Sequence, residues 1–284
     1  SAFLISGFVT LLLALVWISY ATDRPRGHRA VSEGELRLIE GAAFDASSNG
    51  APVSQSVDPA AAARVEGKHD GFTRLIRNRS LILLTFSYAA VSYFQYLFFY
   101  WMQYYFDEVM KLGKEDGRFY ATLPTIAMAI GMMSGGWLAD RAESRWGRRR
   151  GRAIVPALGM LASAVFLAMG ILVSQPLWVV TCFTLALGAL GTSESSFWVT
   201  GVAIGGRRGG LSSSILNAGG NAGGIVAPIL TPFFSRSFGW QAGLALAGFL
   251  CVVGATLWGW IDSGSDEPLN SSDPRLASAS AIYD

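Results

Sequence analysis

Charged residues are scarce in this sequence: Asp, Glu, Lys and Arg make up 15% of its 284 residues, against roughly 25% in an ordinary soluble domain. The two cysteines, Cys182 and Cys251, both lie inside long apolar runs, which excludes a disulfide framework and a paired-cysteine redox site. The two histidines, His28 and His69, lie far apart in one polar connector. A zinc site or a histidine general base is therefore not expected.

Apolar residues, by contrast, make up 51% of the chain and gather in long runs. A run of about 18 residues or more can cross a hydrocarbon core of roughly 30 Å as a helix. Such a segment is expected to be helical because it must satisfy its backbone hydrogen bonds internally in lipid. The predicted spans are residues 2–20, 81–106, 119–139, 153–174, 176–198, 210–234 and 239–261. The sequence therefore predicts an all-α, multi-pass membrane protein with seven transmembrane helices.

The basic residues indicate how these spans are oriented. Of the 22 Lys and Arg residues, 18 fall in segments on one side of the predicted spans and 4 on the other. Because cytoplasmic loops carry the excess of positive charge, the first side is predicted to be cytoplasmic. Ser1 then lies outside, and no initiator methionine is present. We therefore expect the chain to begin in the middle of a larger protein.

Two polar segments flank the main bundle. Residues 21–80 form a predicted cytoplasmic connector whose middle, residues 42–63, has a flexible composition. Within it, residues 31–40 are expected to form a short helix with Ser32 as the N-cap. Residues 71–79 are expected to form an interfacial helix, which anchors the next span through its basic side chains. The tail, residues 263–284, is polar and is predicted to be disordered in the cytoplasm.

One predicted cytoplasmic loop carries the most specific motif. It opens as Gly-x-x-x-Asp-Arg and closes as Gly-Arg-Arg-Arg. Gly135 and Gly136 would let a neighbouring helix approach closely, Asp140 suits a helix N-terminus, and the arginines suit acidic groups or lipid phosphates. A plain positive-inside loop explains the arginines but not the order of the motif. The candidate conformational motif comprises Gly136, Asp140, Arg141, Gly147 and Arg148.

This loop resembles the Gly-x-x-x-Asp-Arg-x-Gly-Arg-Arg motif of the major facilitator superfamily. Its extra residues, 142–146, are similar to those of the anion:cation symporter branch, which includes sugar-acid and other organic-anion permeases. Residues 20–36, 96–105 and 210–228 also look like segments of that branch. The resemblance covers about residues 1–262 and implies helices 6–12 of a twelve-helix transporter. Helix 6 would be residues 1–20, and the C-terminal six-helix bundle would be residues 81–262.

The polar residues inside the spans are the candidates for substrate binding. Glu194 is the one ionisable acid or base in any predicted span. A carboxylate at membrane depth is a functional candidate, either in substrate or proton binding or in a structural hydrogen bond. Tyr96 and Gln103 share one helical face with Tyr93 and Tyr100. That face suits either a water-filled cavity or, for its outer residues, an interfacial aromatic belt.

A glycine-rich span supplies the remaining candidates, Asn217 and Asn221, which are one helical turn apart. They suit either a polar substrate or hydrogen bonds between helices. At Trp101–Gln103 the sequence departs from the Trp-Leu-Pro that is common in the anion:cation branch. The complete set of predicted substrate-binding residues is Tyr96, Tyr100, Gln103, Glu194, Asn217 and Asn221.

The resemblance implies secondary active transport of a small organic anion, plausibly a sugar acid, coupled to a proton or sodium ion. Inverted three-helix repeats would surround a site near the midplane and move by alternating access. The expected partners are this anion, the co-transported ion, membrane lipids and the missing N-terminal helices. No cofactor, metal or nucleic acid is expected, and the expected location is a bacterial inner membrane. Because no arginine lies within the predicted spans, the chain alone should be inactive.

Three other classes of protein compete with a transporter. A truncated or scaffolding membrane protein would not transport and stays open as the main alternative. A seven-helix receptor has the right number of spans but lacks extracellular disulfide cysteines. A membrane enzyme is disfavoured because no catalytic constellation is present.

Overall fold

The computed structural model describes residues 2–22, 27–28, 30–32, 34–36 and 68–262. The chain divides into two units, residues 1–62 and 63–284, which are described separately. In the first, α1 (Ala2–Tyr20) is a continuous helix, and every side chain from Phe3 to Tyr20 is exposed. It is long and apolar enough to cross a membrane, as expected.

A capping box follows α1 at Ser32 and Glu35. The backbone N–H and the hydroxyl of Ser32 donate to Glu35 Oε2 at 3.0 and 3.1 Å, while the Glu35 N–H donates to Ser32 Oγ at 3.3 Å. The hydrogen bond from the Ser32 backbone, and then that from its hydroxyl, lower the pKa of the Glu35 carboxyl. The predicted N-cap is thereby confirmed. The rest of the predicted helix, residues 42–63 and the tail lie outside the described residues.

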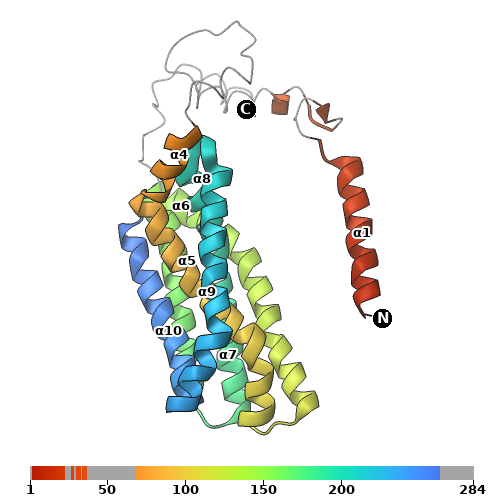
Figure 1. Ribbon diagram of the computed structural model, residues 1–284, viewed down its shortest axis with the longest axis vertical. Coiled ribbons are helices and arrows are strands. Elements are labelled where there is room, and N and C mark those ends of the chain that lie inside the picture. Colours follow the sequence, from red (N-terminus) through yellow and green to blue (C-terminus); the bar gives the residue numbers. More distant parts are fainter. Residues whose placement is uncertain (1, 23–26, 29, 33, 37–67, 263–284) are drawn as a thin grey trace, which may run out of the picture. The chain divides into compact units, whose positions relative to one another are not determined.

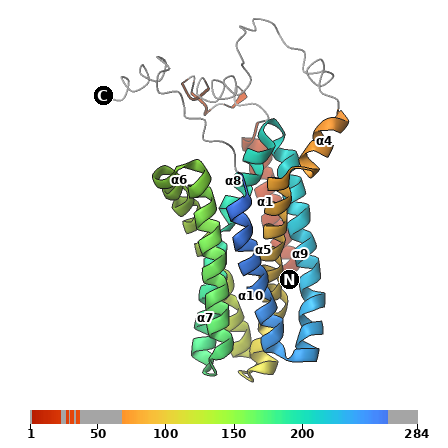
Figure 2. The ribbon, with the colours of Figure 1, turned by 90° about the vertical axis from the view of Figure 1, so that its left-hand side faces the viewer.

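The second unit is a bundle of long helices (Figures 1 and 2). α5 lies against α6, α9 and α10, and the fully buried Phe94, Phe106, Phe183 and Phe197 belong to its core. The elements, in chain order, are α4 (Lys68–Ile76), α5 (Arg79–Tyr104), η2 (Tyr105–Val109), α6 (Lys114–Leu172), α7 (Pro176–Gly191), α8 (Glu194–Gly205), η3 (Gly206–Arg208), α9 (Gly209–Phe238), α10 (Trp240–Leu257) and η4 (Trp258–Trp260).

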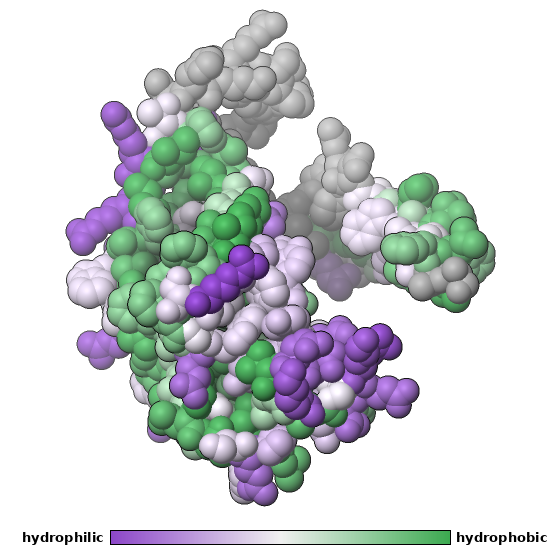
Figure 3. Space-filling model, turned by 60° about the horizontal axis from the view of Figure 1, so that its bottom comes forward, coloured by the Kyte–Doolittle hydropathy of each residue, from purple (hydrophilic) through white to green (hydrophobic). Residues whose placement is uncertain are grey.

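Five described segments are long and apolar enough to span a membrane: Phe3–Tyr20, Arg79–Val109, Lys114–Leu172, Pro176–Gly205 and Trp240–Trp260. The 59-residue α6 contains the predicted span 119–139 and all but the last two residues of the predicted span 153–174. α9 is a 30-residue helix that is not among the five, and its sequence is rich in Ser, Asn and Gly. The surface of the bundle shows hydrophilic clusters among hydrophobic side chains (Figure 3).

The chain turns inside α6 rather than through an extended polar loop. Gly147 has φ 80°, a left-handed conformation that glycine adopts without steric cost. A Cβ atom at Gly151 would overlap the backbone of Ala142 and Glu143. The predicted loop between the spans 119–139 and 153–174 is therefore a tight helical hairpin.

Glycines set the close approach of the helices. A Cβ at Gly223 would overlap the carbonyl oxygen of Ala89, so α9 lies directly on the backbone of α5. A Cβ at Gly135 would likewise overlap the carbonyl oxygen of Thr192. At Gly136 it would meet nothing within 4 Å. The expected close packing is therefore found at Gly135, whereas Gly136 contacts no helix within the described bundle.

A substitution pair in α9 tests this packing. In the full-length protein, Gly223→Ala should lower the unfolding free energy by about 1–3 kcal/mol, because the new methyl group forces α9 away from α5. Gly210→Ala adds the same methyl group in the same helix where a Cβ meets nothing within 4 Å. Reversible unfolding in detergent compares the two variants. Equal stability of both would contradict the packing described here.

Candidate functional site

The segment Pro176–Gly205, which includes the predicted span 176–198, contains a two-residue turn immediately before Glu194. α7 begins at Pro176, as expected, and ends at Gly191; α8 begins at Glu194. In the turn between them, the hydroxyls of Thr192 and Ser193 donate to the carbonyls of Ala189 and Leu190, at 2.7 and 2.6 Å. Ser and Thr side chains compete in this way for helical carbonyls. The Thr-Ser pair thus places Glu194 at the first residue of a new helix.

Three neutral donors converge on the Glu194 carboxylate. The Tyr88 hydroxyl donates to Oε1 at 2.6 Å and the Trp198 indole N–H donates to the same oxygen at 3.2 Å. The Gln95 side-chain amide donates to Oε2 at 3.1 Å. Glu194 is 7% exposed, and within the described residues no ion pair reaches it. Since carboxyl oxygens accept hydrogen bonds, these three donors satisfy both oxygens of the Glu194 side chain.

An aromatic shell surrounds this carboxylate. The Tyr88 ring packs against Phe197 and Trp198, with centroid distances of 5.0 and 5.9 Å. Phe197 is fully buried and meets Trp258 edge to face. A buried charge in such a shell depends on its hydrogen bonds. The Glu194 cluster, defined as Glu194, Tyr88, Gln95 and Trp198, therefore joins α5 and α8 through polar contacts inside an apolar core.

Within the described residues, the other predicted substrate-binding residues make no hydrogen bond to Glu194. Tyr96 is half-buried, and its ring stacks on Tyr100 with centroids 6.0 Å apart. Tyr100 and Gln103 are exposed. Tyr93, expected on the same face, is instead buried, with its hydroxyl 2.9 Å from Thr231 Oγ1. Tyr93 thus joins α5 to α9, while Tyr100 and Gln103, further along the same predicted face, form an exposed surface.

Asn217 and Asn221 form a second exposed polar pair. The Asn221 side-chain amide donates to the carbonyl oxygen of Asn217 at 2.9 Å and to its Oδ1 at 3.2 Å. Gly224 continues the same helical face and lies against the Tyr96 ring. The asparagine pair therefore belongs to a surface that leads along α9 to Tyr96. We name Tyr96, Tyr100, Gln103, Asn217 and Asn221 together the polar strip.

Sequence reasoning found Glu194 but missed its three donors. Tyr88 and Gln95 are seven positions apart, so they share one face of α5, and Trp198 lies one turn after Glu194. These spacings were available in the sequence. Which face of α5 meets Glu194 depends on packing between segments about a hundred positions apart.

The candidate conformational motif pairs its arginine with an acidic group, as expected, but its aspartate caps no helix within the described residues. Arg148 and Arg152 both pair with Glu143, at 3.3 and 3.0 Å. Asp140 and Arg141 are exposed. Within the described residues no hydrogen bond of the Asp140 side chain is found, so the expected helix cap is not seen there. The acidic partner of the arginines is thus Glu143, which the motif itself does not include.

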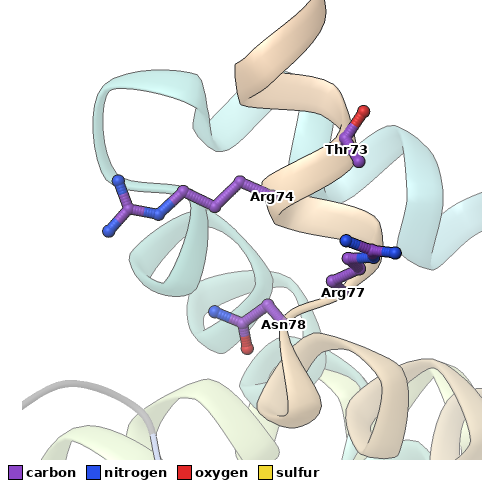
Figure 4. A pocket seen from close by; sticks show the side chains of 4 residues that line it. All are labelled: Thr73, Arg74, Arg77 and Asn78. Atoms are coloured by element: carbon purple, nitrogen blue, oxygen red, sulfur yellow. The ribbon is translucent and has the colours of Figure 1, made fainter.

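A basic cluster marks the start of α5. Thr73, Arg74, Arg77 and Asn78 line a pocket of about 520 Å³ (Figure 4). Asn78 caps α5 by accepting a hydrogen bond from the Leu81 N–H at 3.1 Å, and both arginines are exposed. This arrangement agrees with the predicted basic interfacial helix, although α4 occupies Lys68–Ile76 rather than residues 71–79.

These features define a helical multi-pass membrane protein with a buried, hydrogen-bonded carboxylate between two helices. The family described as the Major Facilitator Superfamily matches residues 1–209. The chain therefore belongs to the Major Facilitator Superfamily.

Named relatives and a solved structure agree with this assignment. The chain is 24% identical over 265 residues to a chloroplastic ascorbate transporter of Arabidopsis thaliana, covering 93% of this chain and 46% of the relative. It is 26% identical over 140 residues to the probable galactarate/D-glucarate transporter GudP of Bacillus subtilis, covering 49% and 29%. A crystal structure of the peptide transporter POT, a mutant in complex with alafosfalin, has a TM-score of 0.50 at 20% identity, covering 72% of this chain and 44% of that chain.

The chain spans less than half the length of either of these two relatives. Both relatives are named as transporters, which agrees with the expectation that this chain is not an enzyme. The likeness to the peptide transporter supports the fold alone.

Two tyrosine substitutions test the Glu194 cluster. Tyr88→Phe should destabilise the full-length protein by about 1–3 kcal/mol, because it removes a hydrogen bond to a buried carboxylate. Tyr93→Phe removes a hydroxyl that interacts with the neutral Thr231 and should cost about 0.6 kcal/mol. Unfolding in detergent measures both. If Tyr93→Phe costs as much as Tyr88→Phe, the special contribution of the carboxylate is refuted.

Proposed function

We propose that this chain is the C-terminal portion of a secondary active transporter for a small organic anion, such as a sugar acid, coupled to a proton or sodium ion. The buried Glu194 cluster carries this proposal, because ionisable groups inside membrane helices are costly and characteristically functional. The ascorbate and galactarate/D-glucarate transporters support the substrate class. We propose a bacterial inner membrane as its location.

Glu194 is the proposed ion-coupling group. In its ionised form it accepts hydrogen bonds from α5 through Tyr88 and Gln95. Protonation removes the negative charge that strengthens these hydrogen bonds and adds an O–H donor to the carboxyl group, so the hold of Glu194 on its partners weakens. A proton, or a sodium ion that competes for the carboxylate, would thereby change how α5 is held against α8. Alternating access requires such a change in helix packing.

The polar strip is the proposed lining of the substrate path. Its phenol and amide groups can donate to carboxylates and also bond hydroxyls, the two functional groups of a sugar acid. In the complete protein these exposed side chains would face the N-terminal helices across the path. The motif around Asp140 and Arg141 would act on the conformational change at the cytoplasmic end.

The coupling role is tested with Glu194→Gln in proteoliposomes of the full-length protein. Accumulation of labelled D-glucarate driven by a proton or sodium gradient should fall by at least about tenfold, because a glutamine side chain cannot exchange a proton or carry the charge that binds sodium. Exchange of internal for external D-glucarate should persist. Glu115→Gln, an exposed substitution at the start of α6, serves as the control. Undiminished accumulation by Glu194→Gln would refute the coupling role.

The substrate role of the polar strip is tested with Asn217→Ala. Loss of the side-chain amide should raise the apparent KM for D-glucarate about five- to tenfold, equivalent to one lost hydrogen bond of about 1 kcal/mol. Thr181→Ala is the control, because that exposed hydroxyl only donates to the Leu177 carbonyl of its own helix. An unchanged KM in Asn217→Ala removes Asn217 from the substrate path.

A further inference from the structure

A pocket of about 400 Å³ lies at the end of the bundle opposite α4, where α5 and α9 end and α10 begins. It is separate from the Glu194 cluster, since Trp101 lies six positions beyond Gln95 on α5, about 9 Å along the helix axis. We name it the aromatic pocket. Its walls are formed by Trp101, Tyr104, Pro232, Ser235, Arg236 and Trp240.

Three aromatic rings build the walls of this pocket. The Trp240 centroid lies 5.7 Å from that of Trp101 and 5.4 Å from that of Tyr104. Trp101 and Tyr104 meet edge to face at 5.9 Å. Gly239, with φ 88°, makes the tight turn that brings the end of α9 beside Trp240. The rings are therefore held in place by both the helix ends and one another.

Two of the residues that line the aromatic pocket carry side-chain donors without partners. The Trp101 indole N–H and the Ser235 hydroxyl are enclosed and have no hydrogen-bond partner in the described part of the chain. Buried donors of this kind are normally bonded. The Arg236 guanidinium is exposed, and among the described residues it has neither an ion pair nor a hydrogen bond. The six lining residues include no acid.

We propose that the aromatic pocket binds a small organic carboxylate. The carboxylate pairs with Arg236, while its carbon skeleton lies against the Trp240 and Tyr104 rings. Arginine is well suited to pairing with carboxylates, and the volume lies in the range of small-molecule sites. A cation that only balances the α9 dipole would explain Arg236 but not the ring-walled pocket beside it.

This site extends the proposed function, because it would receive the anion before the anion reaches the polar strip. With the orientation predicted from the basic residues, the aromatic pocket faces outside. Its physiological ligand rests on the proposed function, but its binding of carboxylates can be measured without transport.

The test is equilibrium binding of D-glucarate to the purified full-length protein at low salt, followed by tryptophan fluorescence. Arg236→Gln should raise the Kd about tenfold, Arg236→Lys should restore part of the affinity, and Trp101→Phe should lose most of the fluorescence response. Arg118→Gln is the matched control, because Arg118 is exposed near the start of α6 and does not line the pocket. D-Glucitol, which lacks the carboxylates, should not bind.

Two results would overturn the inference: no saturable binding of D-glucarate by the wild-type protein, or the same Kd in Arg236→Gln and Arg118→Gln. Size-exclusion profiles and unfolding curves check that each variant is folded, and Arg236→Lys provides a conservative variant should Arg236→Gln fail to fold. Arg236-dependent binding without any uptake refutes the proposed function and leaves this site standing. Uptake of D-glucarate together with a Kd that does not change in Arg236→Gln refutes this site and leaves the proposed function standing.

Discussion

A carboxylate inside a membrane bundle must have hydrogen bonds, and the arrangement of α5, α7, α8 and α9 around Glu194 meets this requirement. The turn at Thr192 and Ser193 ends α7 and presents Glu194 to α5. The glycines of α9 let that helix press on α5, so that Gly220 lies directly against the Tyr88 ring. The hydroxyl of that ring makes the shortest of the three hydrogen bonds to Glu194. The packing of α9 on α5 and the hydrogen bonding of the Glu194 carboxylate therefore depend on each other.

The same turn connects the buried acid to the hairpin inside α6. A Cβ at Gly135 would overlap Thr192, and one at Gly159 would lie 2.5 Å from the Thr192 hydroxyl oxygen. Thr192 is thus held between the two halves of α6, two positions before Glu194. The candidate conformational motif begins at Gly136, directly after one of these contacts. A shift of the hairpin must therefore change the packing around the turn that positions Glu194.

The sequence was sufficient for features that depend on composition or short spacing. Long apolar runs predicted the helices, and Ser32 with Glu35 three positions later formed a recognisable cap. Glu194 stood out because a lone carboxylate in apolar surroundings is conspicuous. Its partners Tyr88 and Gln95 did not, because they lie 106 and 99 positions away. Tyr93 shows the same limit: helical periodicity placed it beside Tyr96 but did not reveal that α9 covers it.

The Glu194 cluster and the aromatic pocket lie apart along the bundle, so the two proposed sites would have different roles in binding charge. An anion needs a positive partner, yet the described spans surround Glu194 with neutral donors only. Placing a fixed arginine beside Glu194 would create a permanent ion pair and reduce the dependence of the carboxylate on an incoming cation. Recognition of the anion at Arg236, away from the carboxylate, avoids this conflict. In the proposed mechanism, the carboxylate would then remain free to respond to a proton or sodium ion, and the negative charge of the substrate would first be bound at the end of α9.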